Sequence, residues 1–286
     1  MQRFDELNGR IQKSDIVIFI RFSHVHESHH AFRKGKGKEL DERIEMVLNE
    51  DRLKSRFDYF ENVCLPALDA QTDTNFNVVL RCSDLLPQKW KDRLFELVIN
   101  RKNIYTAFLS VSERPVPFEK ALLREKLLSE ESDTIITARL DDDDALAVDY
   151  IEKLRRYLHP QFKNHGITFA SGFYMGTYGS GDNKRFKLVP TRKVNGSAGL
   201  AYVSDRRVPV HYILSFAVVH LLLDTATPVI VDSKKPMFIL TAHETNDTDR
   251  SQWKDMIEAK FLTKDELVAQ LGEGLSNINI DQIPGQ

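Results

Sequence analysis

The sequence predicts an α/β protein in which a Rossmann-like, mostly parallel mixed sheet is flanked by helices and followed by a C-terminal helix. Short apolar runs typical of buried strands alternate with amphipathic helical segments along the first half of the chain. The apolar run at residues 135–140 leads directly into four aspartates, Asp141 to Asp144. With 286 residues, the chain is long enough to bury a substantial core in one large domain.

The first predicted strand is the continuous apolar run from Asp15 to Phe22, the pattern of a strand covered on both faces. A second strand is predicted from Phe76 to Cys82 and a weaker one from Ile104 to Leu109. Helices are predicted around Trp90 to Ile99 and from Phe118 to Ser129. Another helix precedes the second strand, because apolar residues recur there at three- and four-residue spacing: Phe57, Phe60, Val63, Cys64 and Leu68.

The second half of the chain is less regular. Gly166 to Met175 is predicted to be a strand, and a turn at 178–183 makes Phe186 to Pro190 the returning strand of a hairpin. The small residues of 193–199 are typical of a segment that lines or closes a site. Further strands are expected at 228–231 and 237–240, and a terminal helix is expected to begin with a capping box formed by Thr263 and Glu266.

Composition excludes some classes of protein. A net charge of -2 with 29% charged residues does not indicate a nucleic-acid partner. The first residues lack the apolar core of a secretion signal, and the longest apolar stretch, Ile213 to Leu223, is too short to span a bilayer. We therefore expect a cytoplasmic protein without a transmembrane segment. Cys64 and Cys82 are expected to be small buried side chains in a reducing compartment rather than a disulfide.

The four aspartates are the strongest functional signal. A buried strand that ends in carboxylates places hard oxygen ligands at the carboxyl edge of a sheet, where open α/β folds bind ligands. Adjacent like charges raise one another's pKa, so an exposed cluster of this kind favours a neutralising cation. The alternative is a solvated acidic turn that caps a helix beginning at Ala145. The preceding strand favours a metal or nucleotide-phosphate site.

The order of motifs resembles the putative rhamnosyltransferase family of bacteria, whose members resemble glycosyltransferases of the A-type (GT-A) fold. The resemblance covers roughly residues 15 to 250. Its most specific block runs from Arg139 through the aspartates to Leu146. The other matching pieces are the run 18–22, the stretches 56–61 and 64–72, the strand 76–80, and His243 with Asn246.

The resemblance implies a metal-dependent enzyme. In A-type glycosyltransferases an Asp-x-Asp motif holds Mn²⁺ or Mg²⁺ against the donor diphosphate. By similarity, Asp141 is expected to contact the donor ribose or a metal-bound water, and Asp143 is expected to ligate the metal. Asp144 is a neighbour that can replace Asp143, and His243 matches a position that supplies a further metal or diphosphate ligand.

Other charged residues stand at predicted strand ends. Arg21, Arg81 and Asp84 follow the first two strands, where a nucleotide base and ribose would lie in a parallel sheet. Arg139 is an unusual residue for a buried strand, so we expect it to reach a carboxylate or a phosphate. The alternative for each is an ordinary ion pair at a strand end.

A histidine-rich and lysine-rich segment follows the first strand. Its imidazoles suggest a zinc site, but their spacing matches no closed zinc motif: they are His24, His26, His29 and His30. The adjoining Arg33 to Lys38, with Lys34 and Lys36, is a cationic loop that can meet phosphates or an anionic glycan, or remain solvated.

We therefore predict a single-domain glycosyltransferase over 1–286, with a nucleotide-sugar half at about 15–150, an acceptor half at about 151–250 and a helical extension at 251–286. Its partners are a nucleotide-sugar donor and a glycan or other hydroxyl acceptor. An inverting reaction needs a carboxylate base, and Asp205 is predicted for it, with Asp224 and Asp232 as alternatives. The competing classes are a metal-dependent phosphohydrolase or nucleotidyltransferase and a non-catalytic glycan- or polyanion-binding protein.

Overall fold

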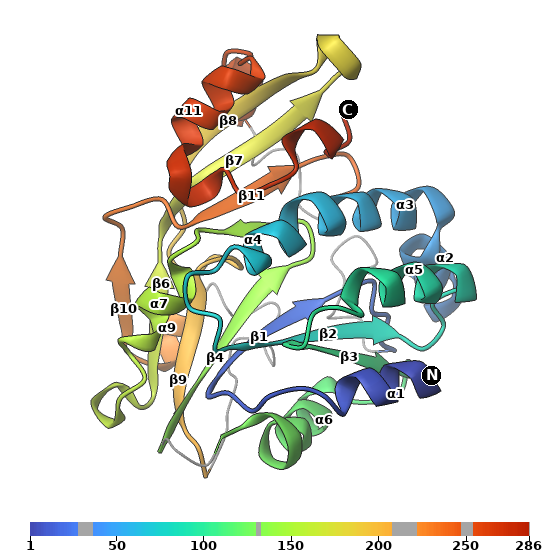
Figure 1. Cartoon of the computed structure of the whole chain (residues 1–286), viewed down its shortest axis with the longest axis vertical. Coiled ribbons are helices and arrows are strands. Elements are labelled where there is room, and N and C mark those ends of the chain that lie inside the picture. Colours follow the sequence, from blue (N-terminus) through green and yellow to red (C-terminus); the bar gives the residue numbers. More distant parts are fainter. Residues whose placement is uncertain (28–36, 130–132, 208–221, 247–253, 286) are drawn as a thin grey trace.

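A seven-stranded sheet forms the centre of the protein (Figure 1). The computed structural model describes residues 1–27, 37–129, 133–207, 222–246 and 254–285. The strand order is β10-β6-β9-β4-β1-β2-β3, and β9 alone among these strands is antiparallel to its neighbours. The strands are β1 (Ile16–Arg21), β2 (Asn77–Ser83), β3 (Ile104–Leu109), β4 (Thr134–Asp141), β6 (His165–Phe169), β9 (Leu200–Asp205) and β10 (Val229–Asp232). The predicted mixed, mostly parallel sheet is confirmed.

Both faces of β1 are buried, as its continuous apolar run predicts. Ile16, Ile18 and Ile20 belong to the larger core, which also holds the apolar side chains of α3 (Glu50–Tyr59) and α5 (Gln88–Val98). Val17 and Phe19 point to the opposite face and pack in a second cluster with α6 (Pro115–Leu122). Because β1 is covered on both faces, the polar groups that follow it can only gather at its carboxyl edge.

A second sheet of four strands, in the order β5-β11-β7-β8, lies beside the first. Its strands are β5 (Ala145–Leu146), β7 (Ser171–Tyr178), β8 (Arg185–Arg192) and β11 (Phe238–Ala242). β7 and β8 form the predicted hairpin. The single strand predicted from Gly166 to Met175 is wrong: Ala170 separates β6 from β7, and the chain passes there from one sheet to the other. Apolar patterning cannot show that break, since both strands are buried.

The second sheet fixes the segment that follows the aspartates. β5 begins one residue after Asp144 and pairs with Phe238 and Ile239 of β11. A helix starting at Ala145 is therefore not formed; the next helix is α7 (Tyr150–Arg155). Pairing with β11 brings the end of β4 close to the residues that follow β11, namely His243 to Asn246.

The remaining helices surround these sheets. Three sequence predictions concern a helix, a capping box and the two cysteines. The helix predicted from Phe118 to Ser129 is instead α6 followed by a π-helix at Leu123–Leu127. The capping box of Thr263 and Glu266 is confirmed at the start of α11 (Lys264–Leu275). Cys64 and Cys82 are buried free thiols. The other helices include α1 (Gln2–Asn8), α2 (Leu40–Leu48), a π-helix at Phe60–Cys64, α4 (Leu65–Asp69), α9 (Leu223–Ala226) and α10 (Lys254–Glu258).

Among the described helices, none is long and apolar enough to cross a membrane.

Candidate active site

The aspartates lie at the carboxyl edge of β4, as predicted, but they do not form an exposed cluster. Asp142, Asp143 and Asp144 have relative accessibilities of 0%, 3% and 5%, and only Asp141, with 27% of its side chain exposed, faces solvent appreciably. The expectation of four exposed, mutually repelling charges is therefore wrong. A buried carboxylate needs a cationic or hydrogen-bonding partner, and each aspartate has its own.

Arg56 supplies the counter-charge for two of them. It projects from α3 and is itself buried. Its Nε donates to Oδ2 of Asp142 at 3.1 Å and its Nη2 contacts Oδ1, so the pair is bidentate. Its Nη1 donates to Oδ2 of Asp143 at 2.7 Å. One guanidinium therefore holds two consecutive carboxylates, the planar geometry in which Arg binds best.

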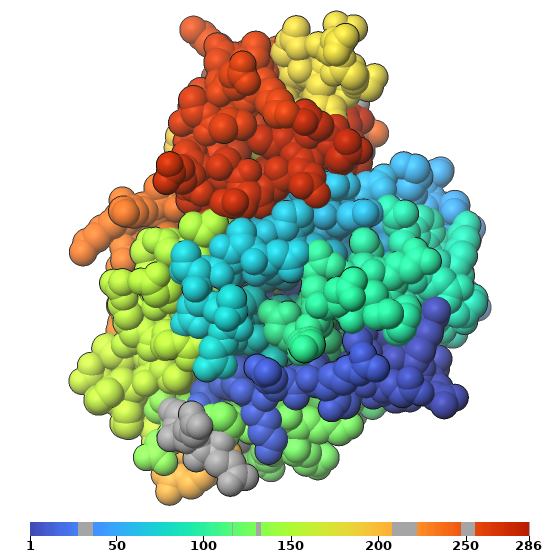
Figure 2. Space-filling model, in the orientation of Figure 1, coloured from blue at the N-terminus to red at the C-terminus, as the bar shows by residue number. Residues whose placement is uncertain are grey.

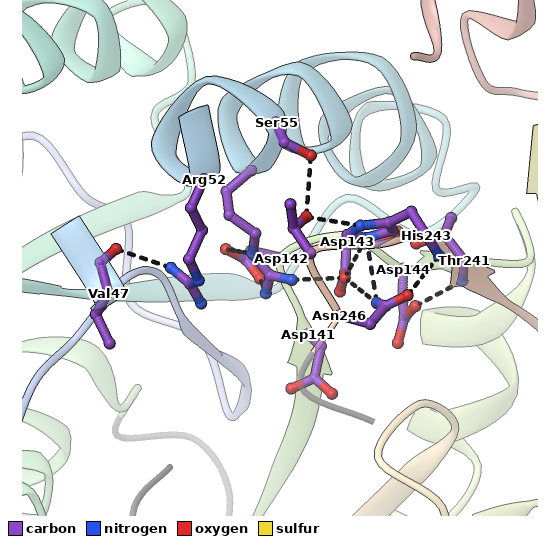
Figure 3. A network of polar contacts seen from close by, with 12 residues as sticks. Val47, Arg52, Ser55, Asp141, Asp142, Asp143, Asp144, Thr241, His243 and Asn246 are labelled. Atoms are coloured by element: carbon purple, nitrogen blue, oxygen red, sulfur yellow. Dashed lines mark hydrogen bonds and ion pairs between the residues drawn. The ribbon is translucent and has the colours of Figure 1, made fainter. Parts of the chain in front are cut away.

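Asp143 is also the centre of a network with the residues that follow β11 (Figure 3). Nε2 of His243 lies 2.9 Å from Oδ2 of Asp143, and Nδ2 of Asn246 donates to the same oxygen at 2.8 Å. Asn246 Oδ1 accepts from the backbone N–H of His243 at 2.6 Å, which closes the turn. Thr245 Oγ1 lies 2.8 Å from Nδ1 of His243 and 3.0 Å from Ser55 Oγ. These contacts fix the ring plane of His243.

Asp144 is bound through Thr241 of β11. Its Oδ1 accepts from the backbone N–H of Thr241 at 3.0 Å, and Thr241 Oγ1 donates to the carbonyl of Asp143 at 2.8 Å. Burial and the charge of Asp143 raise the pKa of Asp144 well above its usual range. Asp144 therefore ties the end of β4 to β11.

The surroundings of the other three carboxyls shift their pKa values in different directions. Burial raises the pKa of Asp142 to about 7, although Arg56 opposes this. Burial also acts on Asp143, but Arg56 and the contact with His243 outweigh it and hold its pKa below the usual range. For Asp141, Arg139 and Arg21 outweigh burial and lower the pKa. Asp141 and Asp143 are thus the two carboxyls whose surroundings favour the ionised form.

Asp141 belongs to a row of charges across three strands. Arg139, two residues earlier on β4, donates through Nη2 to Oδ1 of Asp141 at 3.0 Å, which confirms that this arginine reaches a carboxylate. Arg21 is the register partner of both Asp141 and Arg81. Arg81 is buried and ion-paired at 2.7 Å with Glu119 of α6. Arg139 and Arg21 therefore lie next to Asp141 at the carboxyl edge, and Arg81 is one strand further along it.

The remaining predicted residues near β1 and β2 lie at the same edge. Asp84 is exposed directly after β2. His24 is buried, and burial, followed by the charges of Arg81 and Arg21, lowers its pKa to about 2. The rings of His24 and His26 are 6.3 Å apart. His29, His30 and the loop residues Arg33, Lys34 and Lys36 lie outside the described residues, whereas Lys38 lies within them.

Asp205 is not brought to this edge. It pairs with Thr134, the first residue of β4, because β9 runs antiparallel to β4. The length of β4, about 3.3 Å per residue, therefore separates it from Asp141. Asp205 instead accepts from Lys163 at 2.9 Å and from Arg207, interactions that lower its pKa. Its predicted role as catalytic base does not fit this position.

The two alternatives for the base lie elsewhere. Asp232 ends β10, whose carboxyl end points to the same edge as that of β4, but β6 and β9 lie between them. Three interstrand spacings correspond to about 14 Å. Asp224, in α9, accepts from Asn195 Nδ2 at 3.0 Å.

The site offers Mn²⁺ or Mg²⁺ a small set of oxygen ligands. Among the described residues, no three His, Cys, Asp or Glu side chains are grouped as a ready metal site. His243 is occupied by Asp143 and Thr245, and Asp144 by Thr241. The donors that favour the ionised form are Asp141 and Asp143. Two carboxylates suffice for a cation such as Mg²⁺, which is commonly held by one or two carboxylates together with substrate phosphates and water.

Sequence reasoning missed two residues of this site. Arg56 lies on the helix face that carries Leu53, Phe57 and Phe60, and a charge on an apolar stripe indicates a buried partner. That signal is present in the sequence. Tyr59 stacks on His243, with ring centroids 4.0 Å apart and planes at 16°. No pattern predicts this contact, because it depends on how β11 pairs.

A family profile described as "Putative rhamnosyl transferase" matches residues 15–255. The chain therefore belongs to this family of glycosyltransferases. A search of curated proteins found no match.

Solved structures of S. aureus TarS resemble the chain at low identity. TarS 1–349 in complex with UDP has 12% sequence identity and a TM-score of 0.41, over 81% of this chain and 61% of that one. TarS 1–349 has 12% identity and a TM-score of 0.42, over 80% of this chain and 60% of that one. A further TarS structure has 11% identity and a TM-score of 0.38, over 93% of this chain and 45% of that one. The chain thus spans less than two thirds of the length of these TarS chains.

Proposed function

We propose that this protein transfers a sugar from a nucleoside-diphosphate donor to a hydroxyl acceptor, with a divalent cation held at Asp141 and Asp143. The observation that supports this most strongly is the separation of the four aspartates by environment. Burial raises the pKa of Asp142 and Asp144, whereas for Asp141 and Asp143, spaced as Asp-x-Asp, neighbouring charged groups hold the pKa below its usual range. Membership in the rhamnosyl transferase family supports the reaction type. The cytoplasm is the proposed compartment.

The arginines at the same edge suit an anionic donor. Arg139 donates to Asp141, Arg21 is the register partner of Asp141 on β1, and Arg81 follows on β2. A guanidinium binds phosphate oxygens through two parallel hydrogen bonds and remains charged at any physiological pH. We assign these three side chains to the donor, with Asp84 at the rim.

The cation and the protein side chains have different roles in the proposed reaction. A bound divalent cation supplies a Lewis acid for the negative charge that develops on the departing nucleoside diphosphate. Asp143 holds one orientation, because Arg56, His243 and Asn246 all contact its Oδ2. We therefore assign His243 to the positioning of Asp143 rather than to direct ligation, and Asp144 to the junction of β4 with β11.

Thermal unfolding in the presence of nucleotide sugars tests the proposal. Each sugar nucleotide should be added with Mn²⁺, with Mg²⁺ and with chelator, since a ligand that binds the native state raises the unfolding temperature. Stabilisation that needs both nucleotide and metal, followed by release of an intact nucleoside diphosphate on addition of acceptor, is the expected result. Release of phosphate or pyrophosphate would assign a phosphohydrolase or nucleotidyltransferase instead. Binding of glycans without turnover of any donor would assign a binding protein.

A further inference from the structure

The last described residues of the chain pack against the helix that carries Arg56 and Tyr59. We call residues 276–284 the C-terminal brace. Figure 2 shows the residues near the C-terminus, in red, lying against the stretch around α3 and α4, in light blue. The backbone N–H of Asn279 donates to the carbonyl of Asn62 at 2.8 Å, and Asn279 Nδ2 donates to Asn62 Oδ1 at 3.3 Å. Ile280 and Ile283 are buried in the main core.

The sequence of the helix explains why the brace docks at Asn62. In an α-helix, the carbonyl of Asn62 would accept from the N–H of residue 66, but residue 66 is proline and has none. The helix is a π-helix at Phe60–Cys64, a form that often marks functional sites. Asn62 Nδ2 donates to the carbonyl of Asp58 at 2.9 Å, which orients its Oδ1 toward the brace. Pro66 thus removes the α-helical partner of the Asn62 carbonyl, and the N–H of Asn279 binds that carbonyl.

Tyr59 connects this junction to Asp143. It is the last residue of α3, 2% exposed, and its hydroxyl donates to the carbonyl of Pro284 at 3.4 Å. Its ring stacks on the imidazole of His243, which contacts Asp143. Stacked aromatic rings favour a defined relative orientation, so Tyr59 restricts the orientation of the imidazole.

We propose that Tyr59 is a positioning residue and that the C-terminal brace, through Asn62 and Tyr59, keeps His243 aligned on Asp143. The inference rests on the proposed function for its effect on turnover, but its structural part stands independently. The family match ends at residue 255, so the brace lies outside the matched residues. Correct placement of Asp143 in this chain therefore depends on residues beyond that region.

Two substitutions separate the parts of this arrangement. Asn279→Pro removes the N–H that reaches Asn62, and the φ of -82° at this position is close to that of proline. Asn279→Ala is its matched control, because it keeps the N–H and loses only the longer side-chain bond. Tyr59→Leu removes the stacked ring, and Tyr59→Phe keeps the ring but removes the hydroxyl. Tyr150→Leu is the control for Tyr59→Leu, because Tyr150 is equally buried and packs on Phe169, away from His243.

Hydrogen exchange and kinetics measure the outcome. We expect Asn279→Pro and Tyr59→Leu to speed exchange in peptides covering 136–146 and 238–246 but not in β3. Turnover should fall by about 10- to 100-fold, since a displacement of 1 Å costs on the order of 100-fold, and donor KM should rise, because Asp143 is proposed to hold the cation that binds the donor. Tyr59→Phe should lose less turnover than Tyr59→Leu, Asn279→Ala should retain turnover, and Tyr150→Leu should lose stability but not turnover.

Unchanged exchange in both peptides would overturn the inference, as would a Tyr59→Leu enzyme that loses only stability. If the wild-type protein turns over no nucleotide sugar, the proposed function fails, but the exchange measurement still decides whether the brace positions Asp143.

Discussion

Arg56 Nη1 and Asp143 Oδ2 lie 2.7 Å apart, and the two residues come from α3 and from the end of β4. Asp142 binds the same guanidinium, so one cation compensates two buried carboxyls. Removing one partner of a buried ion pair leaves an uncompensated charge, at a cost of about 3–5 kcal/mol.

Arg56→Met should therefore lower the free energy of unfolding by about 3–5 kcal/mol, measured by urea denaturation at pH 7.5. Lys54→Met on the same helix is the control, because Lys54 forms an exposed ion pair with Asp58. Exposed pairs contribute less than about 1 kcal/mol. Equal losses in the two variants would contradict the central place of Arg56.

Asp143→Asn should abolish metal-dependent binding of a nucleoside diphosphate. The amide cannot supply the anionic ligand, and it also alters the contacts with Arg56, His243 and Asn246. Because Asp143 is buried, the variant should also lose stability, so binding should be measured by calorimetry well below its unfolding temperature. Asp149→Asn, at a partly exposed pair with Lys153, is the control. Unaltered affinity for UDP, GDP and TDP with Mn²⁺ would refute the metal assignment.

Glu119→Gln should change how stability varies with pH. Burial raises the pKa of Glu119 to about 7, against the influence of Arg81. The native state therefore holds this proton between about pH 4 and 7 while the unfolded state has lost it, so this group's contribution to stability falls as pH rises through that range. The slope is at most about 1.4 kcal/mol per pH unit. Urea denaturation from pH 5 to 8 should show the wild type losing stability relative to Glu119→Gln, and parallel profiles would disprove the raised pKa.

Asp205→Asn should retain the turnover of the wild-type enzyme. Asp205 lies beside the first residue of β4, and its partners are Lys163 and Arg207. A general base must reach the proton that it removes, which this position does not allow. Initial rates with the donor identified by the thermal screen provide the measurement. A loss of about 100-fold or more, the range expected for a general base, would restore Asp205 to the reaction.

The first half of the fold could be predicted because its strands are short apolar runs covered on both faces. β1 and β2 lie where their patterns place them, and the aspartates stand at the end of β4. The second half could not be predicted, because β9 is antiparallel to its neighbours β4 and β6. An apolar run does not indicate the direction of its strand in the sheet. That reversal is the reason that Asp205 was misplaced.

The candidate site could also be predicted only in part. The position of the Asp-x-Asp motif and the contact of Arg139 with a carboxylate follow from local sequence. Burial of Asp142 and Asp144 does not, because it depends on Arg56 and on the pairing of β5 with β11. Four adjacent aspartates look alike in a sequence, and only their tertiary partners give them different proton affinities.

The brace has a consequence for the order in which the protein is synthesised. Asp143 leaves the ribosome one hundred residues before His243, and Tyr59 precedes Pro284 by 225 residues. At 5–20 residues per second, the roughly forty residues between His243 and Pro284 take on the order of 2–8 s to add. During that interval a nascent chain holds every charged group of the site but lacks the N–H that completes the helix at Asn62. On the proposed role of the brace, full alignment of Asp143 therefore has to follow the synthesis of residues 276–284.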